Sequence, residues 1–569
     1  MQGGGFLLES QTPEQVFTPE DFTEEHRAIA KTTEEFWNQE IAPRLDVIQH
    51  QQFDVLKKIL RKSAELGLTA VFLPEKYGGM EMDLTSMVLV GQGLARDGSY
   101  AACHGAQTGI GSLPVLLFGT EGQKQMYLPK LASAEIISAY ALTEPQAGSD
   151  ALAARTRADL SADGTHYVLN GQKMWITNGG FADLYTVFAK VGGEKFTAFL
   201  VERTWPGVTP GAEEKKMGLK GSSTTAVYFD NVKVPIENVL GEIGRGHIIA
   251  FNILNLGRLK LGLFALGGAS EVLTDSIRYA KERKAFGKSI SEFGMIQEKL
   301  ARMAVRMYVT ESMAYRVVGE IEAHLTGFSW ESSDASQRVL KAIEEYAAEC
   351  SFIKIFGSEM LDFVVDEGVQ IHGGYGYHQD YLVELAYRDS RINRIFEGTN
   401  EINRLLATGM LLKRAQRGTL PLVEGVKKLQ AEILSGTGAD NQIAAAKKIG
   451  LFLLGVAYQR FGPKLEDQQE VIAGITDVLL SAYALESAEL RACKCGREQA
   501  LNMAAAFASE AMDAIEISAR TVLAACSEGD ELRTNLAVLR RFSKRDAVDT
   551  IALRRKIAAR VLDAGKYVV

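Results

Sequence analysis

The chain has 569 residues, of which 46% are hydrophobic and 24% are charged, an ordinary globular composition with enough length for several domains. Its 63 Lys and Arg residues against 71 Asp and Glu residues give a net charge of -8, so no general affinity for nucleic acid is implied. No run approaches the roughly 20 apolar residues of a spanning helix, and the N-terminus has the features of neither a secretory signal nor a transit peptide. We therefore expect a soluble protein that touches membranes at most peripherally.

The five cysteines form an odd and sparse set, which favours a reducing compartment over a disulfide framework. Cys493 and Cys495 could form half of a metal site, but no second Cys or His pair follows nearby. The sequence therefore predicts no metal.

Residues 1–137 are predicted to form a helical domain. Val55, Ile59 and Leu60 follow the helical period of 3.6 residues. Side chains between Ala101 and Gly111 are small, which allows either close helix packing or room for a ligand.

Residues 138–245 change to a β pattern. Asn170-Gly171 lies between strand-like runs in Tyr167–Thr177, which predicts a hairpin, and Phe196–Val201 and Ala226–Val234 are typical of strands. The preceding loop, Ala141–Asp150, offers backbone N–H groups and hydroxyls that suit a polar cofactor or its phosphates, although many ordinary turns share this composition.

Residues 246–412 return to the helical period, with helices predicted over Ile249–Arg283, Met295–Leu325 and Ser336–Glu367. Arg283–Gly287 interrupts the first two and could clamp a phosphate or form an ordinary turn. His372 stands in a glycine-rich stretch with no nucleophile beside it, which favours a structural histidine.

Residues 413–569 are predicted to form an additional helical domain, a normal size for a domain. Its helices are expected over Leu429–Leu434, Asn441–Arg460, Val471–Cys493, Gln499–Cys526 and Leu532–Val561. Two lysine pairs, Lys427-Lys428 and Lys447-Lys448, flank apolar faces, and either a membrane-surface contact or a solvated helix face would explain them.

The stretch Arg391–Ile402 carries the candidate catalytic residue. Glu397 lies between apolar Ile395 and Phe396 and a flexible Gly398, and Thr399 follows at a helix-cap position. Desolvation in such surroundings raises the proton affinity of a carboxylate, which suits a general base. A surface Glu at a helix N-terminus is the alternative that this stretch alone leaves open.

Five segments in order together resemble the FAD-dependent acyl-CoA dehydrogenases, over about residues 20–412. They are Tyr140–Asp150, Lys173–Asn178, Arg283–Gly287, Gln370–Gly376 and Phe396–Thr399. Three further segments and the extra helical domain resemble the very-long-chain branch: Asn255–Arg258, Phe293–Leu300 and Ile353–Glu359.

The resemblance implies a mainly α fold with an inserted β domain. The expected order is an N-terminal helical domain, a middle β-barrel, a C-terminal four-helix bundle and the extra helical domain. It also implies FAD and an acyl-CoA substrate, with Glu397 as the base that removes the α-proton while a hydride leaves the β-carbon for the flavin. Branched-chain members carry their base just before the arginine that matches Arg258. Here that residue is Gly257, so no carboxylate competes with Glu397.

Further site residues are assigned by resemblance alone. Those expected to contact FAD are Tyr140, Leu142, Thr143, Ser149, Trp175, Thr177, Arg283, Phe286, Gln370, Gly373, Gly374, Thr399 and Glu401. Arg283, Phe286, Gln370, Gly373 and Gly374 are expected to hold the ADP half of FAD across a subunit interface. Those expected to contact the substrate are Ser149, Asn255, Arg258 and Gly398, and the small residues of 101–111 are expected at the bottom of the acyl pocket.

The resemblance favours a homodimeric dehydrogenase of fatty acid β-oxidation for long acyl chains, with electron-transferring flavoprotein as the acceptor. We expect a cytoplasmic protein of bacterial type, with possible membrane contact through residues 413–569. Two alternatives stay open at this point. One is an acyl-CoA oxidase, and the other is a family member with an assembly or scaffolding role.

Overall fold

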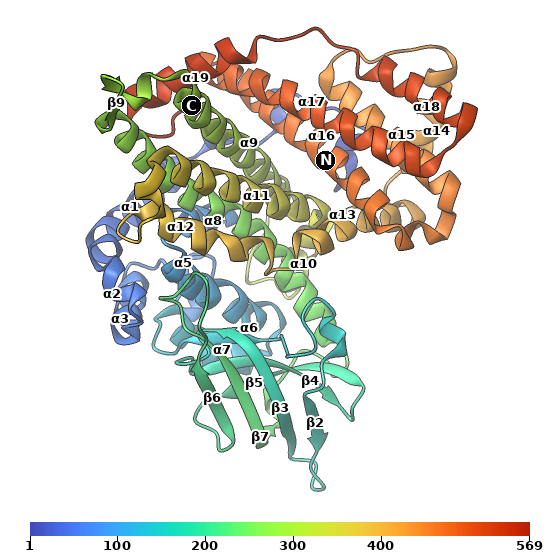
Figure 1. Ribbon diagram of the computed structural model, residues 1–569. Coiled ribbons are helices and arrows are strands. Elements are labelled where there is room, and N and C mark those ends of the chain that lie inside the picture. The colour runs from blue at the N-terminus through green and yellow to red at the C-terminus, as the bar shows by residue number, and fades with distance from the viewer.

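The computed structural model describes residues 1–569 as a mainly helical chain with one inserted sheet (Figure 1). The predicted fold class is therefore confirmed. The sheet lies at one end of the molecule, helices α8 to α13 lie in the middle, and the helices that follow residue 413 lie at the opposite end.

The N-terminal part is built from short helices. Its helices are α1 Glu24–Phe36, α2 Leu45–Gln49, α3 Phe53–Glu65, α4 Leu84–Leu94, α5 Gly98–Gly105, α6 Leu113–Phe118 and α7 Glu121–Ala132. Asp97 caps α5 by accepting a 2.8 Å hydrogen bond from the Tyr100 amide. A π-helical turn, Ala106–Gly111, joins α5 to α6, so the small residues noted in the sequence lie partly in α5 and partly in this widened turn.

The inserted domain is an eight-stranded sheet with its own core of 16 buried residues. Its strands are β1 Ser138–Ala141, β2 Arg157–Leu160, β3 His166–Thr177, β4 Leu184–Val191, β5 Lys195–Glu202, β6 Val208–Glu213, β7 Thr224–Pro235 and β8 Val239–Leu240. The main order is β6-β7-β3-β2-β4-β5-β8, with β1 added in parallel to β4. The strands predicted at Phe196–Val201 and Ala226–Val234 are confirmed as parts of β5 and β7.

The hairpin predicted at Asn170-Gly171 is wrong. β3 runs through both residues as one strand, and its pairing with β7 shifts register between Leu169 and Gly171. A Cβ at Gly171 would come within 2.5 Å of the Thr156 hydroxyl and 2.8 Å of the Thr156 Cα. The glycine therefore serves a close approach of two backbones at a β-bulge, and not a turn.

The central part is dominated by long helices. They are α8 Gly246–Glu282, α9 Gly294–His324, α10 Ala335–Glu345, α11 Ala347–His372, α12 Leu382–Ser390 and α13 Asn400–Gln416, with a small hairpin of β9 Lys284–Ala285 and β10 Lys288–Ser289. The single helix predicted over Ser336–Glu367 is wrong, because Tyr346 leaves helical geometry (φ -106°, ψ 25°) and separates α10 from α11. Tyr346 is fully buried there, and its hydroxyl donates a hydrogen bond to the Met1 carbonyl.

The last six helices are α14 Leu422–Leu434, α15 Gln442–Phe461, α16 Gln469–Cys495, α17 Glu498–Cys526, α18 Gly529–Phe542 and α19 Thr550–Ala564. The single helix predicted over Leu532–Val561 is wrong, since two form and Asp549 caps α19 by accepting a hydrogen bond from the Ala552 amide. α16 and α19 both pack on α9, and Arg316 of α9 pairs with Glu486 of α16 at 3.0 Å.

Lys447 is explained by neither a membrane contact nor a solvated face. Its ammonium is buried, pairs with Glu486 and donates a 2.8 Å hydrogen bond to the Glu9 carbonyl. This lysine ties the N-terminal segment to the last domain.

Two helices, α8 and α16, are long and apolar enough to meet a length-and-composition criterion for crossing a membrane. The expectation that no segment approaches this criterion is therefore wrong. In their most apolar windows, 67% and 78% of the residues are buried inside the protein, so packing in the core explains their composition.

Candidate active site

The loop between α12 and α13 presents Glu397 in an uncommon backbone conformation. Glu397 has φ 56° and Gly398 has φ 79°, two consecutive left-handed residues. For a residue with a Cβ, this conformation costs about 1–3 kcal/mol and persists only where surrounding contacts impose it. As the sequence predicted, Thr399 caps α13, accepting a 3.2 Å hydrogen bond from the Ile402 amide.

Three side chains from other elements hold the carbonyls of this loop. Lys354 on α11 donates 2.7 Å hydrogen bonds to the Gly398 carbonyl and to the Asn400 side-chain oxygen. Asn403 donates to the Gly398 carbonyl at 2.7 Å, and Arg258 on α8 donates to the Glu397 carbonyl at 3.4 Å. Neither Lys354 nor Asn403 was predicted from the sequence. Lys354 lies 44 residues from the carbonyl that it bonds, so no local pattern contains it, whereas Asn403 lies only five residues from the same carbonyl.

The carboxyl group of Glu397 packs against Gly257. A Cβ at Gly257 would lie 2.7 Å from Oε2, so the absence of a side chain on α8 makes the space that the carboxyl occupies. Oε2 is buried without a hydrogen-bond partner. Burial raises the pKa of Glu397, while the nearby charges of Arg258, Lys354 and Lys260 oppose the rise.

Arg258 and Asn255 were expected to contact the substrate. In the structure the Arg258 guanidinium is buried and donates a 2.7 Å hydrogen bond to Asn255 Oδ1 in addition to its bond to the loop. Arg258 therefore positions the loop, and the contact of either residue with CoA stays a prediction.

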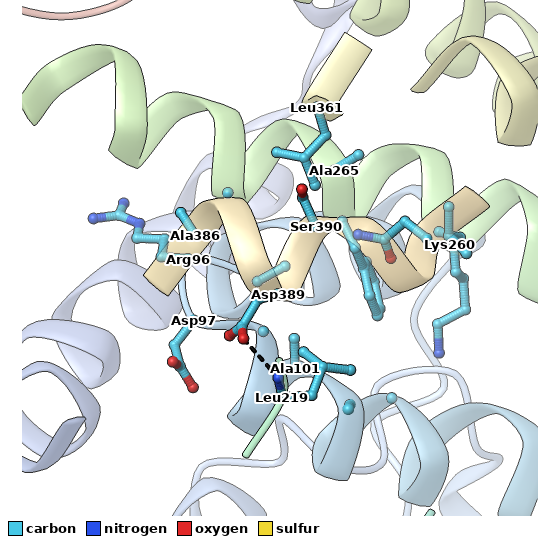
Figure 2. A pocket seen from close by; sticks show the side chains of 18 of the residues that line it. Arg96, Asp97, Ala101, Leu219, Lys260, Ala265, Leu361, Ala386, Asp389 and Ser390 are labelled. Carbon is cyan, nitrogen blue, oxygen red and sulfur yellow. Dashed lines mark hydrogen bonds between the residues drawn. The ribbon is translucent and has the colours of Figure 1, made fainter. Parts of the chain in front are cut away.

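A cavity of about 510 Å³ is lined by Glu397 and by one face of α8. Figure 2 shows Lys260 and Ala265 of this helix among the lining residues. This volume is in the range of small-molecule sites. Five small residues line this cavity: Ala101, Ala102, Gly105, Ala106 and Gly109. The sequence left open whether these small residues serve close packing or make room for a ligand, and the cavity shows that they make room for a ligand. Close packing applies as well at Gly105, where a Cβ would lie 3.1 Å from the Phe264 ring.

Lys260 is a cation in the wall of this cavity that the sequence did not single out. It is buried, and its ammonium donates a 3.3 Å hydrogen bond to Thr108. Burial lowers the pKa of Lys260 to about 8, and the charge of Glu397 opposes this. The side chain therefore adds positive potential beside the carboxylate.

Three residues of the predicted flavin side lie on strands: Tyr140 on β1, and Trp175 and Thr177 on β3. Thr177 lines the cavity together with Glu397, and Trp175 exposes 59% of its surface with φ 57°. The Tyr140 hydroxyl is buried without a partner, and burial followed by the charge of Glu397 raises the pKa of this phenol. An exposed indole, a free hydroxyl and an unpartnered phenol fit the planar polar ring that the resemblance implies.

The loop over Thr143–Ser149 is fastened by a buried ion pair. Lys173 on β3 pairs with Glu144 at 2.7 Å, with 0% and 1% side-chain exposure, and its ammonium also donates to the Leu142 carbonyl at 3.1 Å. The Met174 amide donates to the Thr143 carbonyl. Ser149 stays exposed beyond this anchor, so its hydroxyl is free to meet a ligand.

A second hollow of about 660 Å³ contains part of the predicted ADP-binding set: Arg283, Phe286, Gly373 and Gly374. Gln370 is exposed but does not line the hollow. A Cβ at Gly373 or Gly374 would meet nothing within 4 Å, and Phe286 is 97% exposed. An open glycine floor beside an arginine and an uncovered ring fits the nucleotide half of FAD.

Within one chain, this second hollow lies far from Glu397. Gly257 and Glu282 lie 25 positions apart on α8, which corresponds to roughly 38 Å along the helix axis. The two sites of one chain are thus separate, as the expected binding across a subunit interface requires. His372, at the edge of the second hollow, stacks on Tyr279 at 4.1 Å and bonds the Gly368 carbonyl, which agrees with a structural histidine.

Two residues expected near the adenosine lie at the start of α13: Thr399 is its N-cap and Glu401 is in its first turn. The Thr399 hydroxyl is engaged as the helix cap. Glu401 is exposed, and a hydrogen bond from its own backbone N–H is the main cause that lowers the pKa of its carboxyl. Their contacts with a cofactor stay predictions.

Four family models match the chain. They are described as the N-terminal, middle and C-terminal domains of acyl-CoA dehydrogenase, matching residues 23–135, 139–232 and 244–411, and a further acyl-CoA dehydrogenase C-terminal domain, matching residues 445–541. The probable acyl-CoA dehydrogenase of Bacillus subtilis is 48% identical over 100% of this chain and 98% of its own length.

The mitochondrial very long-chain specific acyl-CoA dehydrogenase of Rattus norvegicus is 42% identical, over 62% of this chain and about half (53%) of its own length. Among solved structures, the acyl-CoA dehydrogenase complexed with FAD from Bacillus anthracis superposes with a TM-score of 0.98 at 48% identity and covers both chains fully. The residues 413–569 therefore have a counterpart in that structure.

Proposed function

Because the chain belongs to the acyl-CoA dehydrogenase family, we propose that it oxidises long-chain acyl-CoA to trans-2-enoyl-CoA in fatty acid β-oxidation, with Glu397 as the base. The enzyme is an FAD-dependent oxidoreductase. The observation that carries the assignment of the base is the buried, unpartnered Oε2 of Glu397 at the start of the apolar cavity.

FAD, when bound, supplies the acceptor for the hydride that leaves the β-carbon. The chain supplies the base: Glu397 Oε2 accepts the α-proton, and the electron pair of that C–H bond forms the new double bond. A carboxylate withdrawn from water has a raised pKa, which brings its proton affinity closer to that needed near neutral pH.

Arg258 and Lys354 position the base and do not themselves need to touch the reacting carbons. Both donate to carbonyls of the loop, and both charges oppose the rise of the Glu397 pKa. These charges favour the ionised carboxylate, although burial, the larger effect, raises its pKa. Fixed geometry of this kind lowers the barrier because little reorganisation remains for the reaction step.

The preference for long chains is supported by the small residues on α5 and the π-helical turn and by the length of the cavity along α8. Apolar α8 residues line the cavity from Leu261 to Gly268, a continuous wall that a long alkyl chain can cover. Each methylene buried there contributes about 0.8 kcal/mol. Long chains are therefore expected to bind more tightly than short ones.

A homodimer is part of this proposal, since the second hollow would complete the FAD site of a second copy. Electron-transferring flavoprotein is the proposed acceptor, by resemblance to the family. Oxygen uptake with palmitoyl-CoA in the absence of any other acceptor would identify an oxidase in its place.

Anaerobic titration of the purified flavoprotein tests the function. Acyl-CoAs of increasing length are added and the loss of flavin absorbance is followed, with long chains expected to bleach it. Glu397→Gln should keep the flavin and lose the bleaching, whereas Glu424→Gln, on an exposed turn of α14, should behave as the parent. Bleaching of the Glu397→Gln variant at the parental rate would exclude Glu397 as the base.

A further inference from the structure

The cavity does not end inside the protein. The α8 residues that line it beyond Gly257 recur every three or four positions, which is one face of the helix: Lys260, Leu261, Phe264, Ala265, Gly268, Glu271, Thr274, Asp275 and Arg278. The side chain of Arg278 is 70% exposed. The cavity therefore reaches solvent at this end of α8.

The chemistry of the wall changes along the way. Up to Gly268 the α8 residues beyond Lys260 are apolar, and after it they are polar or charged. Arg96, which precedes α5, also lines this end and lies 3.9 Å from Glu271. We call Arg96, Glu271, Thr274, Asp275 and Arg278 the distal mouth. Figure 2 shows Arg96 at the end of the cavity away from Lys260.

The distal mouth has balanced charge. Arg96 faces Glu271, and Arg278 pairs with Asp275 of the preceding turn. Two cations and two carboxylates leave no net charge to select an ion. They do offer both hydrogen-bond donors and acceptors, which a neutral hydroxyl can use at once.

A distance along α8 can be expressed as the number of carbons of an extended acyl chain that would span it. A helix rises about 1.5 Å per residue, and an extended alkyl chain rises about 1.25 Å per carbon for C–C bonds of about 1.5 Å at tetrahedral angles. From Gly257, beside the base, Gly268 is about 16 Å away and Glu271 about 21 Å. A chain running along this face would thus put carbon 12 against the apolar wall and carbon 20 at the distal mouth.

We propose that the distal mouth binds a hydroxyl group at the ω-end of acyl chains of about 20 carbons, so that ω-hydroxyacyl-CoAs of this length are substrates. The inference rests on the proposed function and adds a substrate class to it. A hydroxyl on a shorter chain would lie beside the apolar face of α8 from Leu261 to Gly268, which offers it no side-chain partner, whereas at the distal mouth the α8 side chains offer donors and acceptors.

The test compares matched pairs of substrates, with and without a terminal hydroxyl, at 12 and at 20 carbons. At 12 carbons the hydroxyl is expected to lower kcat/KM roughly ten- to hundredfold, the rejection typical of an apolar pocket. At 20 carbons the two members should agree within about threefold. Equal penalties at both lengths would overturn the proposal.

Gly268→Phe provides a second measurement. A Cβ at Gly268 would make ordinary 3.5 Å contacts with Ala95 and Leu361, and Gly268 lines the cavity. The ratio of kcat/KM for the 20-carbon over the 12-carbon substrate should fall at least about tenfold. Gly409→Phe on α13, with open space around it, should leave this ratio unchanged.

The two proposals fail differently. If neither dodecanoyl-CoA nor eicosanoyl-CoA bleaches the flavin, the proposed function is wrong. If both do, but the ratio for Gly268→Phe equals that of the parent, or the hydroxyl penalty persists at 20 carbons, only the distal mouth is wrong.

Discussion

Gly257→Ala is expected to stabilise the protein and to impair catalysis. The new Cβ would lie 2.7 Å from Glu397 Oε2 and 3.2 Å from the carboxyl carbon, and ordinary contact begins near 3.4 Å. The carboxyl must therefore retreat by roughly 0.7 Å, and a displacement of about 1 Å at a reacting group can cost about 100-fold in rate. We expect kcat to fall roughly 10- to 100-fold, which corresponds to about 1.4–2.7 kcal/mol of activation free energy.

The free energy of unfolding should change in the opposite direction. Alanine in a helix interior is favoured over glycine by up to about 1 kcal/mol, and Gly257 lies within α8. Urea unfolding and steady-state kinetics on the same preparation would measure both quantities. Gly409→Ala, in α13 with nothing near its Cβ, should show the gain in stability without the loss of rate. A Gly257→Ala enzyme with kcat within about threefold of the parent would refute the contact between this glycine and the base.

Two further predictions concern the charges at the loop. Lys354→Met removes a cation that opposes the rise of the Glu397 pKa, so the acid limb of the pH profile of kcat/KM should move to higher pH. The hydrogen bonds lost with Lys354 should lower the free energy of unfolding by about 1–3 kcal/mol. Asn403→Ser, which removes a neutral donor to the same carbonyl, should not move that limb, and a shift of equal size would argue against the charge effect. The pKa of Glu397 is higher in the folded protein than its ordinary value of 4.5, so the ionised carboxylate destabilises the folded state above the folded-state pKa. Below pH 4.5 the residue is protonated in both the folded and the unfolded state, and this cost disappears. Glu397→Gln should therefore stabilise the protein at about pH 7–8 and lose this advantage near pH 4. Chemical unfolding at the two pH values measures this, and an equal difference at both would contradict the burial of the carboxylate.

The sequence alone determined the kind of elements and their order. Long segments with a 3.6-residue period became α8, α9, α16 and α17 within a few residues of their predicted limits, because helix formation follows local spacing. Prediction from the sequence failed where a residue that is distant in the chain but close in space changes the structure that a local motif forms. Gly171 follows an asparagine as in a hairpin, yet the approach of Thr156 makes it part of a continuous strand.

Only the tertiary structure decided what surrounds the base. The residues that surround Glu397 come from helices more than 40 positions away, among them Gly257, Arg258 and Lys354, with 139 residues separating Arg258 from the carbonyl it holds. The burial of a side chain and the charges near it depend on residues that are far apart in the sequence, so a short stretch of sequence does not reveal them. Glu397 could be singled out from its loop, but the raised pKa, the fixed backbone and the cavity in front of it exist only after α8, α11 and α13 have packed together.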